Sequence, residues 1–303
     1  MSHRFTCGSF AAPLGPFIEG AGQKGGTVLG SSPTAAYLAF DDVVVAVTAR
    51  TVPLMPNAMA VIERAGLEVF EAGAPVVMSG AGLRSGRVVL VWEQARPVDL
   101  AVPLNQGSDA PAAARRGRDL LQMLGREPDP IAAIAGACPE LGTGEGLEGV
   151  RLLQTALIAG EPEVASRAAR LLTGRGPGLT PEGDDLLAAA TAGLAAFERP
   201  ISMNRRLARN LRAGFVLHDV GERTGSLSAS LLGHAAAGWV IDPVRSLLDL
   251  TIERATWERS LDRLERIGHS TGRTYALGCA LTAIALADGY RSHQANELRK
   301  EKT

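Results

Sequence analysis

The stretch Gly174–Leu187, GRGPGLTPEGDDLL, marks the point where a glycine-rich loop enters a helix. Its first five residues include three glycines and a proline, which cannot continue a helix, whereas Leu186–Phe197 is rich in alanine and leucine and favours one. Thr180 and Pro181 are typical of a helix start, and the acidic residues that follow lie where the helix dipole favours negative charge. The sequence therefore predicts a helix that begins beside this loop.

Such a loop suits a ligand site, because backbone amides next to a helix start can bind an anion. The adjacent carboxylates of Asp184 and Asp185 could hold a cation such as Mg²⁺ or accept protons. A helix that follows a surface loop uses the same residues for capping alone, so this alternative stays open. The loop lacks the Lys-Ser/Thr ending of a P-loop and does not follow a strand, as a dinucleotide-binding turn does.

The flanking sequence predicts an α+β fold, with an N-terminal antiparallel β domain followed by an α-helical bundle domain. From Ala112 onward, apolar residues recur at intervals of three and four, and Leu186–Leu194 and Tyr275–Leu286 are apolar on nearly every side. We expect these two runs at the centre of the bundle. Six short segments before residue 105 predict strands of a small barrel or a sandwich. These are Thr27–Leu29, Ala36–Phe40, Val43–Val47, Ala58–Ile62, Pro75–Met78 and Val88–Trp92. The predicted domains are 1–107 and 108–303.

Composition excludes several classes of function. Among 303 residues, 31 Lys and Arg nearly balance 32 Asp and Glu, so the net charge of -1 argues against nucleic acid and an anionic membrane surface as partners. Cys7, Cys138 and Cys279 lie far apart, which argues against a zinc site and a disulfide framework. No run is long and apolar enough to predict a signal peptide or a membrane span, so we expect a cytoplasmic protein.

Two further turns carry similar chemistry. In RTGSLSAS, Arg223–Ser230, the hydroxyls of Thr224 and Ser228 could donate to an anion. In IGHSTGRT, Ile267–Thr274, a histidine lies between a glycine that ends one helix and hydroxyls that begin the next. If the three helix starts converge in space, they form an anion pocket; otherwise their polar residues serve as caps.

The three motifs in this order, Gly-Leu-Thr-Pro-x-Gly-Asp-Asp, a Thr/Ser helix start and Gly-His-Ser-Thr-Gly, resemble the AllH-like family over about Thr27–Ala287. The resemblance implies a subunit of an oxamate carbamoyltransferase, which interconverts oxalurate plus phosphate with oxamate plus carbamoyl phosphate in allantoin breakdown. It implies FdrA-like and AllG-like partner subunits and a small substrate such as carbamoyl phosphate, oxamate or a related ureido compound. A homo-oligomer is also compatible with the sequence.

The matched residues and the chemistry of carbamoyl transfer lead us to expect three catalytic residues: His269 as the acid or base, and Asp184 and Asp185 either orienting it or holding Mg²⁺. We expect the substrate to bind at Gly178, Thr180, Gly183, Thr224, Ser228, Ser270, Thr271 and Gly272. Three arginines could clamp a phosphate: Arg175, Arg223 and Arg273. Thr274, where the family pattern expects an acidic residue, and Gly225 depart from the pattern and leave the substrate open. The alternatives are a non-catalytic adaptor that docks the partner subunits, and a stand-alone protein that binds or hydrolyses a small ureido or carboxylate compound.

Overall fold

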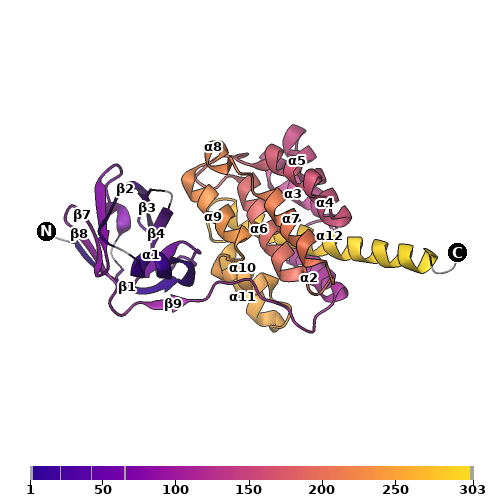
Figure 1. Ribbon diagram of the computed structural model, residues 1–303, viewed down its shortest axis with the longest axis horizontal. Coiled ribbons are helices and arrows are strands. Elements are labelled where there is room, and N and C mark those ends of the chain that lie inside the picture. The colour runs from indigo at the N-terminus through magenta and orange to yellow at the C-terminus, as the bar shows by residue number, and fades with distance from the viewer. Residues whose placement is uncertain (1–2, 21, 42, 65, 301–303) are drawn as a thin grey trace. The chain divides into compact units, whose positions relative to one another are not determined.

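The computed structural model describes residues 3–300 apart from residues 21, 42 and 65. The chain forms two compact units (Figure 1). The first ends at Ala101 and also contains Trp239–Asp242, while the second contains Val102–Gly238 and continues from Pro243. Strands make up the first unit and helices the second, which confirms the α+β class. The domain boundary after residue 107 stays a proposal.

The first unit is a closed barrel. Eight strands pair in the order β5-β4-β3-β2-β6-β7-β8-β1, and β1 pairs with β5 to close the ring, while β9 pairs with β1 outside it. Closure removes the exposed strand edges that an open sheet would present, so of the barrel and the sandwich the chain adopts the barrel. The strands are β1 (His3–Ala11), β2 (Lys24–Ser31), β3 (Ala35–Phe40), β4 (Val43–Ala49), β5 (Ala58–Val61), β6 (Pro75–Ser79), β7 (Gly82–Ser85), β8 (Val88–Val91) and β9 (Arg96–Val98).

The prediction of an antiparallel sheet is wrong for three of the pairings. β1 is parallel to β8 and to β9, and β4 is parallel to β5. The prediction rested on the lack of a crossover helix, but the irregular segment between β4 and β5 returns the chain without one. β1 meets β8 and β9 from far away in the sequence, so no hairpin turn sets its direction. The remaining pairings are antiparallel.

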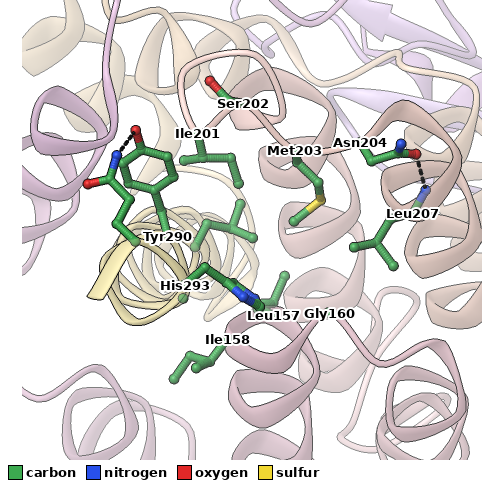
Figure 2. Close-up of a pocket in the computed structure, with 13 residues that line it drawn as sticks. Leu157, Ile158, Gly160, Ile201, Ser202, Met203, Asn204, Leu207, Tyr290 and His293 are labelled. Carbon is green, nitrogen blue, oxygen red and sulfur yellow. Dashed lines mark hydrogen bonds between the residues drawn. The ribbon is translucent and has the colours of Figure 1, made fainter. Parts of the chain in front are cut away.

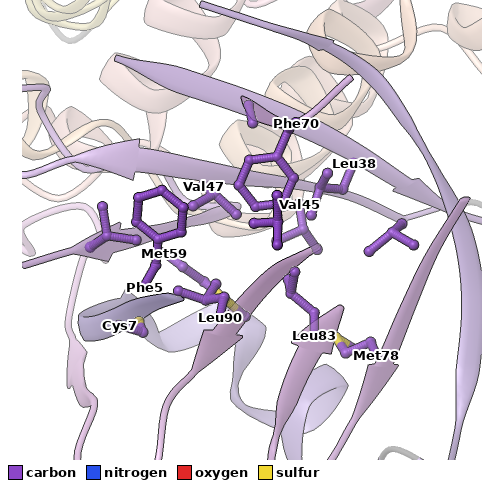
Figure 3. Close-up of a cluster of buried hydrophobic side chains, with 14 of the residues drawn as sticks. Phe5, Cys7, Leu38, Val45, Val47, Met59, Phe70, Met78, Leu83 and Leu90 are labelled. Atoms are coloured by element: carbon purple, nitrogen blue, oxygen red, sulfur yellow. The ribbon is translucent and has the colours of Figure 1, made fainter. Parts of the chain in front are cut away.

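The barrel interior is filled by apolar side chains that alternate along the strands (Figure 3). Phe5 and Cys7 of β1 point inward, and the ring of Phe5 stacks on that of Phe70 at a centroid distance of 6.2 Å. The short helix α1 (Gly15–Glu19) contributes Ile18 to the same core. Two 3₁₀ turns, Ala12–Leu14 and Leu67–Val69, complete this unit.

The second unit is built from helices. They are α2 (Ala110–Met123), α3 (Pro130–Ala137), α4 (Gly144–Ala159), α5 (Pro162–Leu172), α6 (Glu182–Phe197), α7 (Arg205–Phe215), α8 (Val220–Arg223), α9 (Ser226–Ala236), α10 (Asp242–Leu248), α11 (Arg254–Leu264) and α12 (Thr271–Lys300), with a 3₁₀ turn at Pro139–Leu141. Over the part of the chain that the structure describes, no helix has both the length and the apolarity needed to cross a membrane.

Helix α6 lies at the centre of this unit, because all 16 of its residues are buried. It packs closely against α12, where a Cβ added at Gly193 would lie 2.9 Å from Thr282 and one added at Gly278 would lie 2.6 Å from Ala189. Small residues at the crossing therefore let the two helices approach, as the two apolar runs led us to expect. A regular bundle arrangement of the other helices stays a proposal.

Buried polar side chains fix the ends of these helices. Asn105, in the left-handed region with φ 45°, donates to the carbonyls of Ala196 and Leu248 and accepts from the amide of Leu250. Arg116 donates to carbonyls that include that of Leu247, at 2.8 Å, near the end of α10, and burial lowers its pKa to about 10. These contacts satisfy carbonyls that a helix end leaves without partners.

Candidate functional site

The starts of α6, α9 and α12 meet at one place, which we call the motif cluster. The hydroxyl of Thr224, just before α9, donates to the carboxylate of Asp184 on α6, 40 residues away in the sequence. The hydroxyls of Thr180 and Thr271, 91 residues apart, are 2.9 Å from each other. The three turns that the sequence singled out therefore converge.

Asp184 ties the glycine-rich loop and the start of α9 to α6. Its carboxylate accepts a hydrogen bond from the amide of Gly174 at 2.8 Å and others from the hydroxyls of Thr224 and Ser228. The side chain is only 2% exposed, and this burial raises its pKa although the three hydrogen bonds act in the opposite direction. The hydroxyls of Thr224 and Ser228, which could have donated to a bound anion, thus donate to a carboxylate of the protein itself.

Glu182 and Asp185 occupy the face of α6 that meets the start of α12. They are 5% and 1% exposed, and their carboxyls are hydrogen-bonded by Ser270 and Thr271 respectively. Burial raises the pKa of both, and the charges of the neighbouring carboxylates raise that of Asp185 further. One oxygen of each, Glu182 Oε2 and Asp185 Oδ2, has no hydrogen-bond partner among the described residues. The sequence analysis missed Glu182; its signal was a spacing of three residues from Asp185 on one helix.

Two further buried groups surround these carboxyls. Tyr275 of α12 is 3% exposed, and burial together with the charges of Asp185 and Asp184 raises the pKa of its phenol well above the usual value. Cys138 lies with its Sγ 3.4 Å from the hydroxyl of Thr274, and burial raises the pKa of this thiol to about 11. A thiol with this pKa is protonated at neutral pH, so Cys138 is not an activated nucleophile.

The glycine-rich loop passes over the start of α6. Gly174, Gly176 and Gly178 have φ angles of 76°, 113° and 95°, a region that other residues rarely adopt. A Cβ at Gly176 would lie 2.9 Å from the amide nitrogen of Glu182, whereas one at Gly178 would meet no atom within 4 Å. Leu179 is 66% exposed. The loop is therefore close-packed at its base and open at its tip.

One family model matches this region of the chain. The family is described as oxamate carbamoyltransferase subunit AllH, and the match covers residues 172–283, from the end of α5 into α12. This segment is AllH-like. The matched segment contains all three motifs of the cluster, which confirms the family resemblance, although over a shorter range than about Thr27–Ala287. Neither the curated proteins nor the solved structures contain a match.

Other residues of the AllH-like segment serve packing or are exposed. A Cβ at Gly183 would lie 1.9 Å from the carbonyl oxygen of Leu172, and one at Gly272 would lie 1.7 Å from that of Leu264. These two glycines permit close backbone contacts within the protein. His269 is exposed in the turn before α12, and its charge lowers the pKa of Glu182.

The three arginines expected to clamp a phosphate each have a carboxylate partner. Arg175 pairs with Glu145 at 2.6 Å, Arg223 with Asp219 at 2.7 Å, and Arg273 with Glu265 at 3.8 Å. Their charges are partly neutralised by these partners, and none of the three pairs includes a carboxyl of the motif cluster. An anion at the AllH-like motifs would depend on backbone amides and hydroxyls more than on these side chains.

A magnesium ion at Asp184 and Asp185 stays a prediction. Among residues 3–300, excepting the three that are not described, no group of three or more His, Cys, Asp and Glu side chains is placed to hold a metal ion. The two aspartates also have different partners, since Asp184 bonds to Gly174 and Thr224 whereas Asp185 bonds to Thr271. Any metal here would therefore need ligands from water or substrate.

A cavity of about 560 Å³ lies elsewhere in the helical unit (Figure 2). Its apolar wall includes Leu157, Met203, Leu207 and Leu286, and polar groups such as Tyr290 lie beside them. Leu286 is 15 residues after Thr271 on α12, which corresponds to about 22 Å along the helix axis. The cavity is therefore separate from the motif cluster.

Proposed function

We propose that this chain is a subunit of an oxamate carbamoyltransferase-like enzyme and that its substrate binds at the motif cluster. The observation that carries the proposal is the convergence of three helix starts around three buried carboxyls, inside the segment that matches the AllH family. Buried groups with raised pKa values are typical of catalytic sites. The AllH-like description supports the reaction class, and the convergence of the three helix starts supports the proposed location.

Carbamoyl transfer needs a proton carrier and stabilisation of negative charge. In this reaction the amide nitrogen of oxamate bonds to the carbamoyl carbon, the bond from that carbon to the phosphate oxygen breaks, and one proton leaves the nitrogen. Asp185, whose pKa burial raises, suits the proton transfer, and His269 is the second candidate acid or base. Asp184 positions the loop and α9 around them. The alternative use of Asp184 and Asp185 is to hold Mg²⁺.

The anionic end of the substrate fits best at the start of α9. Its N-cap residue is Gly225, which has no side chain to cap the first turn, and Gly225 and Ser226 are exposed, so backbone amides there suit a phosphate or a carboxylate. The further residues that we propose as walls of the substrate site are Gly178, Thr180, Gly183, Thr224, Ser228, Ser270, Thr271 and Gly272. FdrA-like and AllG-like subunits are the proposed partners, in the cytoplasm.

A second candidate function is that of a non-catalytic adaptor. The observation that favours it is the exposure of Leu179, 66%, at the tip of a loop that would face a partner subunit. In this case the buried carboxyls and their hydroxyl partners hold the helix starts together and bind no substrate. A stand-alone protein that binds a small carboxylate is the third candidate.

A thermal-shift titration of the full chain separates these functions. Phosphate, carbamoyl phosphate and oxamate are each tested with and without Mg²⁺, on the wild type and on Asp184→Asn and His269→Ala. We expect carbamoyl phosphate at saturation to raise the melting temperature by several degrees, because a ligand that binds only the folded state stabilises it. Both variants should lose this shift, whereas Arg254→Ala, whose ion pair lies on α11, should keep it. No shift with any compound would refute the substrate site and favour the adaptor.

Catalysis itself is tested in the assembled complex with the FdrA-like and AllG-like subunits. Asp184→Asn should abolish carbamoyl transfer while the purified variant stays folded. Unchanged turnover of the complex that contains this variant would refute a catalytic or positioning role of Asp184.

A further inference from the structure

The two oxygens without partners in the motif cluster constrain what can bind there. Glu182 Oε2 and Asp185 Oδ2 belong to side chains that are 5% and 1% exposed, and no donor among the described residues reaches either atom. The two residues are three positions apart on α6, so their carboxyls lie on the same face of the helix. Burial of an acceptor without a hydrogen bond is unfavourable, so a ligand that supplies donors would gain from this pair.

The chemistry of the pair disfavours an anionic group at this position. A phosphate or a carboxylate would meet the two oxygens that have no donor, and each of Glu182, Asp184 and Asp185 that is ionised would repel it. A group with N–H donors fits the position better. Two acceptors side by side match the two N–H bonds of a planar NH₂ group, as a carbamoyl group presents them.

We infer that Glu182 and Asp185 form an acceptor pair for the NH₂ of the substrate's carbamoyl group. This inference rests on the proposed function and deepens it, because it gives the two ends of the substrate different places. The NH₂ lies at the start of α12, between the carboxyls, and the anionic end lies at the start of α9. Glu182 thereby becomes a specificity-determining residue.

The glycine-rich loop lies against the start of α6, next to the acceptor pair. Its backbone at Gly176 covers the amide of Glu182, and a Cβ at Gly176 would lie 2.9 Å from that nitrogen. Pro177–Leu179 at the tip is exposed, and no atom lies within 4 Å of a Cβ position at Gly178.

The test compares ligands that differ only in the NH₂ group. Acetyl phosphate replaces the NH₂ of carbamoyl phosphate with a methyl group, and pyruvate does the same for oxamate. Dissociation constants for the full chain are measured by calorimetry. A site built around hydrogen bonds to NH₂ rejects the analogue that lacks it, so we expect each carbamoyl compound to bind about tenfold or more tighter than its methyl analogue.

The variant Glu182→Gln should reduce this preference to about twofold. In the wild type, the backbone N–H of Glu140 donates a hydrogen bond to the Glu182 side chain. In the variant, the glutamine oxygen must accept this bond, so the NH₂ of the glutamine faces the ligand. This NH₂ is a donor and cannot accept from the NH₂ of the ligand. Glu182→Met, which keeps a similar volume and removes both acceptors, should do the same. Glu163→Gln changes an exposed acid in the first turn of α5 and should leave the preference unchanged.

The outcomes separate the inference from the proposed function. Equal binding of the carbamoyl and methyl compounds by the wild type overturns the inference and leaves the proposed site standing. A preference that survives in both Glu182 variants also overturns the inference alone. If methylammonium competed for the site with an affinity equal to that of oxamate, the site would be a cation site, and this result would also overturn the inference. No binding of any of the four compounds overturns the proposed function together with the inference.

Discussion

Replacing Asp184 with alanine should destabilise the helical unit by about 3–4 kcal/mol. The change removes the acceptor of three hydrogen bonds, from the amide of Gly174 and the hydroxyls of Thr224 and Ser228. Ser228 is 2% exposed, so its hydroxyl loses an acceptor away from water at about 1–3 kcal/mol. Gly174 and Thr224 are half-buried, so in the variant their donors can form hydrogen bonds with water instead. The loss of each of these two bonds therefore adds about 0.5–1.5 kcal/mol to the destabilisation. Burial raises the pKa of Asp184, so relief of its desolvation offsets part of the loss.

The assay is thermal denaturation of the full chain, followed by circular dichroism. For a unit of roughly 200 residues, each kcal/mol corresponds to about 2–4 °C, so the melting temperature of Asp184→Ala should fall by roughly 6–16 °C. For Asp184→Asn the melting temperature should fall by about a third as much. The asparagine carbonyl can still accept from the amide of Gly174, and the Thr224 hydroxyl can rotate to accept from the asparagine NH₂. Asp219→Ala, which removes a surface ion pair with Arg223, is the matched control and should change little. An alanine variant that melts within 2 °C of the wild type would refute this reasoning.

Three further predictions concern stability. Because burial raises the pKa of Asp185, its stabilising contribution is fully present below the ordinary pKa of about 4 and is lost as pH rises through the raised value. Urea denaturation from pH 4 to 8 should show this fall. Asp185→Asn should reduce it, and the raised pKa values of Glu182 and Asp184 should account for what remains. Gly183→Ala should lower the free energy of unfolding by about 3 kcal/mol or more, since its Cβ would lie 1.9 Å from the Leu172 carbonyl oxygen. Gly233→Ala in α9 has free space for a Cβ and should raise it by roughly 0.5–1 kcal/mol. Equal melting temperatures of the two variants would contradict this reasoning. Asn105→Ala should cost about 2–4 kcal/mol in the same assay, because it leaves buried carbonyls without donors, and a loss below 1 kcal/mol would exclude that role.

Local patterns in the sequence predicted most of the elements. The β-branched run Val43–Val47 and the apolar runs of α6 and α12 are regular enough to fix their type, and the structure has them as expected. β1 escaped notice because Gly8 and Ser9 interrupt its alternation of apolar residues. Its conformation depends on pairing with β5 and β8, which come more than 45 residues later and cannot be inferred from a local pattern.

The candidate site shows the same division. Asp184 and Asp185 could be chosen from the sequence because a glycine loop, a helix start and paired carboxylates coincide there. The spacing of Glu182 from Asp185 puts it on the same face of the helix, but its burial and its oxygen without a partner depend on tertiary packing, as does the burial of Tyr275. From the sequence, the hydroxyls of Thr224 and Ser228 could donate to an anion or serve as caps, and tertiary packing directs them to Asp184.

The sequence by itself therefore determined the kinds of elements, the three helix starts and the AllH-like motifs, since these follow from residue propensities and spacings within single segments. Tertiary structure alone decided the closed barrel with its parallel pairs, and the convergence of the starts of α6, α9 and α12. It also decided the pKa shifts of the carboxyls, because desolvation depends on every segment that packs around a group and not on its neighbours in the chain.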